Sequence, residues 1–409
     1  MTLAKAVEIA DRLAEPNAAA LPTGQAWWRQ SLAHGVPGIA LLHTELAAAG
    51  VRPFRRVHDW LIVAAGSAVT SGASTGLFYG APAVAFALAG AAAVRPGTYR
   101  AALASVDARI TADALRRVNK AHARIEAGHL PVMAEFDAIR GLAGVGAYLL
   151  HRDPDGAALR AILGYLVRLT QPLTINGQAL PGWWTLTGPT GRIDAEFPGG
   201  HGNCGVAHGI CGPLALLAQS QRRGVNVDGQ REAINIICTW LDSWRIHTDA
   251  GYRWPYMITR GELISRPAHV RHSGAKRRPS WCYGTVGIAR SLQLAALATG
   301  DDNRRHIAEQ ALLSSLTDPA QRALTTDASL CHGYAGLAHI TACASADTDE
   351  PTASRLRALV PELLNQAVAL PTTETPGVLE GAAGIALTAL SPITRAGTAT
   401  SWDTCLLIA

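Results

Sequence analysis

The sequence predicts an all-α fold: a closed (α/α) toroid in which seven outer helices surround seven inner ones. Three observations support this prediction. A Gly-led apolar phrase recurs seven times, the segments between its copies have helical periodicity, and the 409 residues are 48% hydrophobic but only 16% charged. Charge well below the roughly 25% of an average globular protein favours one large body over small modules. We therefore expect residues 1–409 to form a single toroidal domain, with an open helical solenoid as the alternative.

The repeated phrase is a Gly, a small residue three positions later, and then an apolar run. The small residue is Gly in six copies and Ala83 in the other. Apolar residues on most faces predict buried inner helices, and the paired Gly residues let backbones approach closely where these helices converge. The copies begin at Gly35, Gly80, Gly141, Gly209, Gly284, Gly333 and Gly381.

The segments between the phrases carry apolar residues at three- and four-residue spacing, which predicts amphipathic outer helices. A buried helix and a more polar one therefore alternate along the chain. Closure into a ring would satisfy every repeat without terminal caps. The clearest outer segments are residues 6–14, 98–125, 159–170, 231–246, 305–316 and 354–370.

Residues 170–203 break the pattern, because they are rich in Gly, Pro, Thr and Trp and lack helical periodicity. We expect an extended or short-stranded, non-helical insertion within the domain. It is either a candidate partner-binding surface or simply a long connection.

The stretch from Trp60 to Val94 contains no charge and exceeds the ~20 residues that span a bilayer. Its middle is small, hydroxylated and interrupted by Gly and Pro, which favours a buried helix-turn-helix, so no integral membrane segment is expected. The N-terminus lacks the features of a secretory signal, and the seven Cys do not have the spacing of a disulfide scaffold. We expect a cytoplasmic protein that reaches a membrane only through a biosynthetic complex. Long basic runs are missing, so nucleic acid is not the expected partner.

Residues with metal-binding chemistry precede two of the Gly phrases. Cys282 stands two positions before Gly284, and Cys331 and His332 directly precede Gly333. If inner helices begin on one rim of a ring, these three side chains converge. Two thiols and an imidazole suit zinc, and three protein ligands leave the open position of a catalytic site. A structural site with His208 as a fourth ligand is the alternative. The remaining thiols lack such a setting and are expected to be structural: Cys204, Cys211, Cys238, Cys343 and Cys405.

The motifs WCYG, CHG and AHG on a sevenfold Gly-helix repeat resemble the lanthionine synthetase C family, the cyclases of lantibiotic biosynthesis. The resemblance covers essentially the whole chain, and the pairing of WCYG with CHG about fifty residues later is highly specific. It implies an (α/α) toroid with a central zinc ion. The implied zinc ligands are Cys282, Cys331 and His332, the set already derived from the residues.

The resemblance also implies catalytic residues. It places the catalytic His on His208, its acidic partner on Asp137, an active-site Arg on Arg278 and a Tyr on Tyr283. Asp137 would fix the tautomer of His208 or would instead cap the helix that follows. Arg278 would stabilise enolate charge or steer an acidic peptide, unless it belongs to a solvated basic turn. Tyr283 would donate a hydrogen bond near the metal or simply pack.

The implied reaction is the zinc-dependent addition of a Cys thiol of a dehydrated lanthipeptide precursor to dehydroalanine or dehydrobutyrine. The product is a lanthionine or methyllanthionine thioether ring, and the implied pathway partners are a dehydratase and an exporter. An (α/α)-barrel glycosidase or terpene-type cyclase needs paired carboxylates or an Asp-rich motif, whereas only Asp137 and Glu380 stand near helix starts. A zinc-containing peptide- or thiol-binding adaptor without turnover remains the non-enzymatic alternative.

Overall fold

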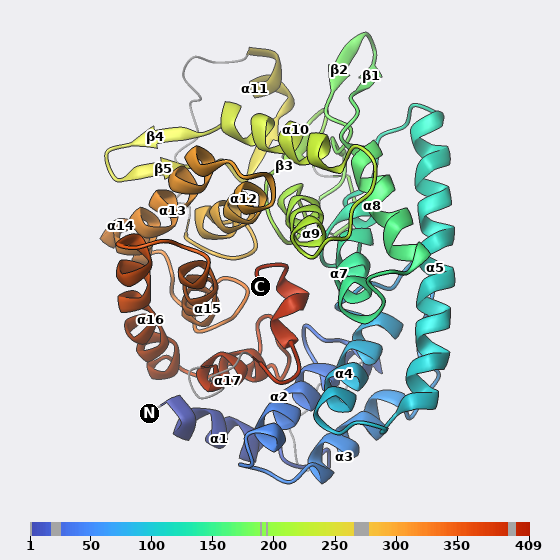
Figure 1. The fold of residues 1–409 in the computed structure, drawn as a ribbon, viewed down its shortest axis with the longest axis vertical. Helices are drawn as coiled ribbons and strands as arrows, with labels where there is room; N and C mark the ends of the chain where they lie inside the picture. The colour runs from blue at the N-terminus through green and yellow to red at the C-terminus, as the bar shows by residue number, and fades with distance from the viewer. Residues whose placement is uncertain (1, 18–25, 189, 194, 266–277, 392–397) are drawn as a thin grey trace. The chain divides into compact units, whose positions relative to one another are not determined.

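The computed structural model describes residues 2–17, 26–188, 190–193, 195–265, 278–391 and 398–409 (Figure 1). These residues are mostly helical, with a few short strands, as the sequence predicted. They divide into two compact units. The first comprises Met1–Asp113, Thr325–Leu407 and Ala409, and the second comprises Ala114–Leu324 and Ile408. Ring closure and a single-domain organisation stay predictions.

The first unit brings together helices from both ends of the chain. Its Gly-led helices contact one another in the order α15, α17, α2 and α4, so the last repeat packs against the first. The more polar helices α16, α1 and α3 pack on α15, α17 and α2 respectively. The bounds are α1 (Thr2–Arg12), η1 (Ala26–Gln30), α2 (Val36–Ala48), α3 (Arg55–Ala65), α4 (Ala81–Val94), α15 (Tyr334–Ala346), α16 (Thr352–Ala369), α17 (Ala382–Leu390) and η2 (Trp402–Leu406).

The second unit repeats this arrangement with the middle of the chain. Its Gly-led helices contact in the order α7, α9 and α12, and α8, α10 and α13 pack on them. The amphipathic helix α5 (Arg100–Glu126) begins in the first unit and ends in the second. The other helices are α6 (Met133–Phe136), α7 (Leu142–Arg152), α8 (Ala157–Leu169), α9 (Cys211–Arg222), α10 (Gln230–Ser243), α11 (Arg260–Ser265), α12 (Thr285–Thr299), α13 (Asp302–Thr317) and α14 (Pro319–Arg322).

Among the described residues of the second unit, three two-stranded antiparallel sheets lie outside the helical repeat. Strands β1 (Leu173–Ile175) and β2 (Gln178–Leu180) form a hairpin, as do β4 (Ile246–Thr248) and β5 (Gly251–Arg253). Strand β3 (His201–Asn203) is fully buried and pairs with β6 (Met257–Thr259) in the register His201↔Thr259. The described part of 170–203 therefore contains strands and no helix, and β3 leads directly into the loop before α9.

The second Gly of the phrase is required by the turn that precedes its helix at Gly287 and Gly336. A Cβ on Gly287 would lie 2.1 Å from the carbonyl oxygen of Trp281, and one on Gly336 would lie 2.1 Å from that of Leu330. In both cases the obstructing carbonyl belongs to the residue six positions earlier. At these two positions the backbone approaches its own preceding turn, rather than a second helix as the sequence analysis expected.

The last described segment is fastened to the first Gly-led helix. The buried Glu45 carboxylate of α2 accepts hydrogen bonds from the Thr400 amide at 2.7 Å, the Thr400 hydroxyl at 2.5 Å and the Ala399 amide at 3.1 Å. The C-terminal residues thus pack on the first repeat.

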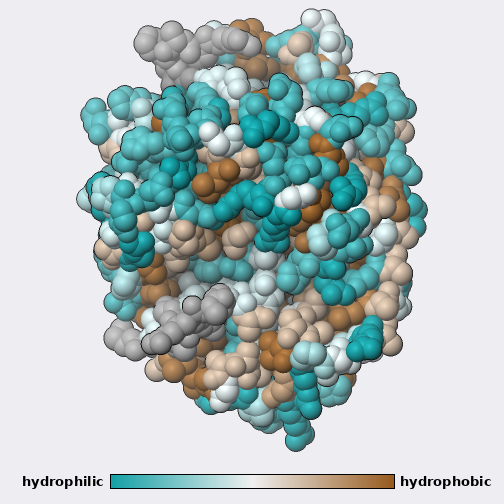
Figure 2. Space-filling model, in the orientation of Figure 1, coloured by the Kyte–Doolittle hydropathy of each residue, from teal (hydrophilic) through white to brown (hydrophobic). Residues whose placement is uncertain are grey.

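The uncharged stretch from Trp60 to Val94 ends in α4, whose residues from Ala81 to Ala91 are all buried. No helix in the described part of the chain is both long and apolar enough to cross a membrane. On the molecular face drawn in Figure 2, polar residues alternate with small apolar areas.

We predict that Gly287→Ala destabilises the protein, because its Cβ displaces the Trp281 carbonyl and with it the turn that carries Cys282. The expected loss in the free energy of unfolding is about 1–3 kcal/mol. Gly164→Ala in α8 is the matched control, because no atom lies within 4 Å of its added Cβ. This control should be neutral or more stable by about 0.5–1 kcal/mol. Urea denaturation measures both, and equal effects would contradict the turn argument.

Candidate active site and metal centre

Cys282 lies in the turn between Pro279 and α12. The side chain is only 8% exposed, and its sulfur lies 3.7 Å from the hydroxyl oxygen of Ser280. The carbonyl of Cys282 accepts hydrogen bonds from the amides of Val206 at 2.9 Å and Ala207 at 3.3 Å. These bonds fix the Cys282 turn against the segment that carries His208.

Cys331 and His332 occupy the equivalent turn before α15. The Cys331 amide donates to the carbonyl of Leu379 at 2.8 Å, which ties this turn to the one before α17. The His332 Nε2 atom lies 3.5 Å from a carboxylate oxygen of Asp327. Metal-binding His residues commonly have such a carboxylate partner, which orients the ring. Sequence analysis missed Asp327, although an acid five positions before a candidate ligand was a usable signal.

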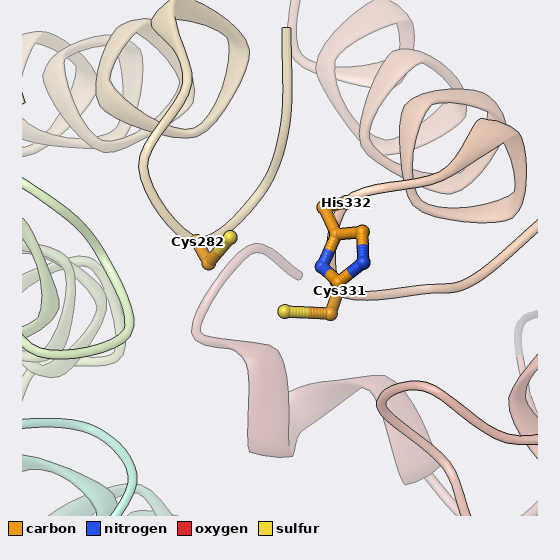
Figure 3. Close-up of side chains that lie close together, drawn as sticks. All are labelled: Cys282, Cys331 and His332. Atoms are coloured by element: carbon orange, nitrogen blue, oxygen red, sulfur yellow. The ribbon is translucent and has the colours of Figure 1, made fainter. Parts of the chain in front are cut away.

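The structure places the three predicted zinc ligands in one group. One ligand atom from each of Cys282, Cys331 and His332 lies within 4.8 Å of the other two. Both sulfurs and the imidazole point toward the same space (Figure 3). Two soft sulfur donors with one imidazole nitrogen form a donor set that zinc prefers.

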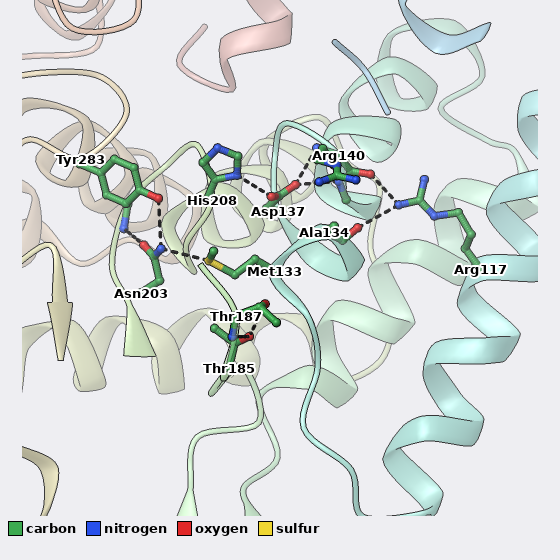
Figure 4. Close-up of polar contacts among 12 residues, drawn as sticks. Arg117, Met133, Ala134, Asp137, Arg140, Thr185, Thr187, Asn203, His208 and Tyr283 are labelled. Carbon is green, nitrogen blue, oxygen red and sulfur yellow. Dashed lines mark hydrogen bonds and ion pairs between the residues drawn. The ribbon is translucent and has the colours of Figure 1, made fainter. Parts of the chain in front are cut away.

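Asp137 is the partner of His208 and also holds the turn before α7. It does not cap that helix, the other role that the sequence analysis left open, because Gly141 occupies the N-cap position and no side chain bonds to the helix amides there. One carboxylate oxygen accepts from the amides of Arg140 and Gly141, each at 2.7 Å, just before α7. The other lies 2.7 Å from His208 Nδ1 (Figure 4). A carboxylate only accepts, so Nδ1 carries the proton of this bond. The opposite nitrogen, Nε2, is thereby left for other chemistry.

Arg117 of α5 supports the Asp137 turn from outside. Its guanidinium donates to the carbonyls of Arg140 at 2.7 Å and Ala134 at 3.2 Å, which lie on either side of Asp137 (Figure 4). The carboxylate of Asp137 is only 1% exposed. The position of His208 therefore depends on a buried and well-braced acid.

Tyr283 is held by Asn203 at the end of β3. The Asn203 side-chain amide donates to the Tyr283 hydroxyl oxygen at 3.2 Å, and its oxygen accepts from the Gly205 amide at 2.9 Å. The rings of Tyr283 and His208 stack with centroids 6.3 Å apart. Asn203 was missed by sequence analysis, because its partner is 80 residues away and no motif marks it.

Arg278 lies at the start of the same turn as Cys282. Its carbonyl accepts from the Tyr256 hydroxyl at 3.0 Å, and the Tyr256 ring packs against Tyr283 with centroids 5.9 Å apart. Among the described residues, no hydrogen bond joins its guanidinium to Asp137 or His208. The backbone of Arg278 therefore lies beside the candidate site, whereas no hydrogen bond of its described side chain reaches Asp137 or His208.

A polar cavity of about 300 Å³ opens beside His332 in the first unit. Thr373, Thr375 and the acids Asp327 and Glu380 contribute to its lining. The imidazole of His332 is thus within reach of a molecule that enters from this side. The sequence analysis had noted Glu380 only for its place near a helix start.

The seven Cys residues all lie in the described part of the chain, and none of them forms a disulfide there. Burial raises the pKa of Cys238 to about 12 and also raises the pKa values of Cys211 and Cys405 well above their usual range. Such thiols stay protonated, in keeping with a structural role. Cys343 differs, because it lies beside His339 and Asp403.

A family model described as lanthionine synthetase C-like protein matches residues 26–407. The chain therefore belongs to this family, which confirms the resemblance drawn from its motifs. The nisin biosynthesis protein NisC of Lactococcus lactis subsp. lactis is 28% identical over 210 residues, 50% of this chain and 48% of NisC. The match thus spans about half the length of that curated relative. The solved structure of nisin cyclase covers 99% of this chain and 97% of its own, with a TM-score of 0.80 and 21% identity, which shows a shared fold.

We predict that Asp137→Asn reverses the hydrogen bond to His208 without losing the turn before α7. The Asn oxygen would still accept from the amides of Arg140 and Gly141, so its NH₂ group would face His208 and force the imidazole proton onto Nε2. ¹⁵N chemical shifts of the His208 ring measure this tautomer. Asp137→Ala is the comparison: it also removes the two amide bonds of the turn and should cost about 1–3 kcal/mol in unfolding free energy. A proton that stays on Nδ1 in the Asn variant would contradict the assignment.

Proposed function

We propose that this protein is a zinc-dependent lanthipeptide cyclase. It would add Cys thiols of a dehydrated precursor peptide to dehydroalanine or dehydrobutyrine and so form lanthionine or methyllanthionine rings. The observation that carries the proposal is the group formed by Cys282, Cys331 and His332. The His208–Asp137 pair and the membership of the chain in the lanthionine synthetase C-like family support it. The similarity to a nisin biosynthesis protein supports the substrate class but not a particular peptide.

The three-residue group fits zinc by its chemistry and by its spacing. A tetrahedral ion with bonds of ~2.0–2.3 Å separates its ligand atoms by roughly 3.3–3.8 Å, and the three ligand atoms here lie within 4.8 Å of one another. Asp327 would orient His332 as a ligand. Zinc held there would deprotonate a coordinated substrate thiol and leave it nucleophilic.

His208 would return a proton to the substrate. In the addition, the thiolate sulfur bonds to the β-carbon and the electron pair of the carbon–carbon double bond moves to the α-carbon and its carbonyl. The α-carbon must then be protonated. With Nδ1–H held by Asp137, His208 in its doubly protonated, cationic form would donate the proton on Nε2 and be left neutral, and such general acid catalysis typically contributes ~10²–10⁴-fold in rate.

The neighbouring side chains would assist this proton transfer. Tyr283, fixed by Asn203, would donate a hydrogen bond near the reacting groups. Arg278 would stabilise the negative charge of the enolate or attract an acidic peptide segment.

We also propose the finer features of architecture and setting. The shared fold of nisin cyclase and the contact between α17 and α2 support a closed toroid of seven inner and seven outer helices. The protein would act in the cytoplasm beside a dehydratase and an exporter of its pathway. The strands of residues 170–203 would provide a peptide-binding surface.

We predict that Cys282→Ala and Cys331→Ala each lower the zinc content by one ion per chain and abolish cyclisation. Cys238→Ala in α10 is the matched control, because this buried thiol stays protonated and lies outside the group. Metal content is measured by mass spectrometry of the purified protein, and folding by circular dichroism. Unchanged zinc in both variants would contradict the ligand assignment, and collapse of the fold would indicate a structural ion.

We predict that His208→Asn keeps zinc but slows ring closure by ~10²–10⁴-fold, because the proton donor is lost. His34→Asn is the matched control, since His34 precedes Gly35 at the equivalent point of the first repeat. Rates are measured by thiol consumption on a dehydrated peptide and compared with the reaction without enzyme. Closure at the wild-type rate would exclude His208 as the acid. Turnover on such a peptide also separates a cyclase from an adaptor.

A further inference from the structure

A second group of metal-binding side chains lies in the first unit, formed by His339, Cys343 and Asp403. His339 and Cys343 are four residues apart on α15 and so project from one face of the helix. Asp403 comes from η2 in the C-terminal segment. The sequence analysis assigned Cys343 a structural role, because no repeat pattern links it to Asp403.

The spacing of this group is that of a tetrahedral metal site. His339 Nε2 lies 3.1 Å from an Asp403 oxygen and 3.8 Å from the Cys343 sulfur. Ligand atoms around a tetrahedral zinc ion are separated by roughly 3.3–3.8 Å. A small adjustment of side chains would therefore admit the ion without moving the helix.

The group is held in place by neighbours that are not ligands. The Thr398 hydroxyl donates to the other Asp403 oxygen at 3.3 Å, and the Trp402 ring packs on His339 with centroids 4.7 Å apart. Glu45 fastens the same segment through Thr400. The three ligands are thus preorganised before any ion binds.

The charge of the group also favours a cation. Asp403 supplies a carboxylate, and a Cys thiol loses its proton when it binds a metal ion. The imidazole of His339 can bind the same ion in its neutral form, so a divalent cation would balance the charge of the two acidic ligands.

We propose that His339, Cys343 and Asp403 bind a second divalent metal ion, for which zinc is the best match. The ion ties the C-terminal segment to α15. The fourth position is open to water or an exogenous ligand, because Cys343 and its surroundings are only partly buried. This ion is separate from the one proposed for catalysis and does not depend on it.

The test is a titration of the full-length, chelator-treated protein with Zn²⁺ alone. We expect two ions per chain in the wild type and one in Cys343→Ala, with the affinity of the lost site reduced by more than the ~10–100-fold typical of outer-shell changes. Asp403→Asn, which keeps an oxygen facing His339 but loses the charge, should weaken the same site. Cys405→Ala, a buried thiol of the same segment, is the matched control and should bind two ions.

A second measurement isolates the site. In a Cys282→Ala, Cys331→Ala double variant, Co²⁺ should bind one site with the absorption bands of a tetrahedral ion carrying one thiolate. Adding Cys343→Ala should remove those bands. Equal zinc stoichiometry in the wild type and Cys343→Ala overturns the proposal. His339, Cys343 and Asp403 would then be a hydrogen-bonded group without a metal ion. If no zinc binds at Cys282 and Cys331, the cyclase proposal fails, and the wild type should then bind one ion and Cys343→Ala none. The difference of one ion between these two proteins therefore tests the second site independently.

Discussion

The turn before the Gly-led helices is the constraint on which both the fold and the candidate site depend. At Gly287 and Gly336 the first turn of the helix lies close to the turn that precedes it. A Cβ at either position would collide with a backbone carbonyl of that preceding turn. Because the same turn recurs, residues just before each Gly occupy equivalent positions. Cys282 and Cys331 therefore owe their placement to backbone geometry that their own side chains do not determine.

Asp137 shows how one side chain connects stability with chemistry. One of its oxygens accepts from the amides of Arg140 and Gly141 just before α7, and the other contacts His208. These amide bonds fix the carboxylate, so the imidazole is aligned by a group that cannot rotate without opening the turn. Preorganisation of this kind lowers the cost of holding a side chain in one position.

Much of this arrangement could be predicted from the sequence, because the Gly phrase and helical periodicity are local signals. The Gly-led helices begin directly after their Gly, except for α9, which begins at Cys211, two residues after Gly209. The hairpin β4–β5 and helix α11 were not predicted, since their short segments carry no periodicity. The sequence analysis missed the roles of Asn203, Asp327 and the partners of Cys343 for a related reason. Each acts through a contact that the spacing of the repeats does not predict.

The bond between Glu45 and Thr400 has a consequence for synthesis of the chain. It joins residues 355 positions apart, within a unit that contains both the first and the last repeat. During synthesis, the Glu45 carboxylate of α2 lacks its hydrogen-bond partners until α17 and the residues after it have been made. Contacts of such long sequence separation slow folding and prolong the exposure of apolar surface. The middle of the chain, whose partners are closer in sequence, is therefore free to fold before the two ends that flank it.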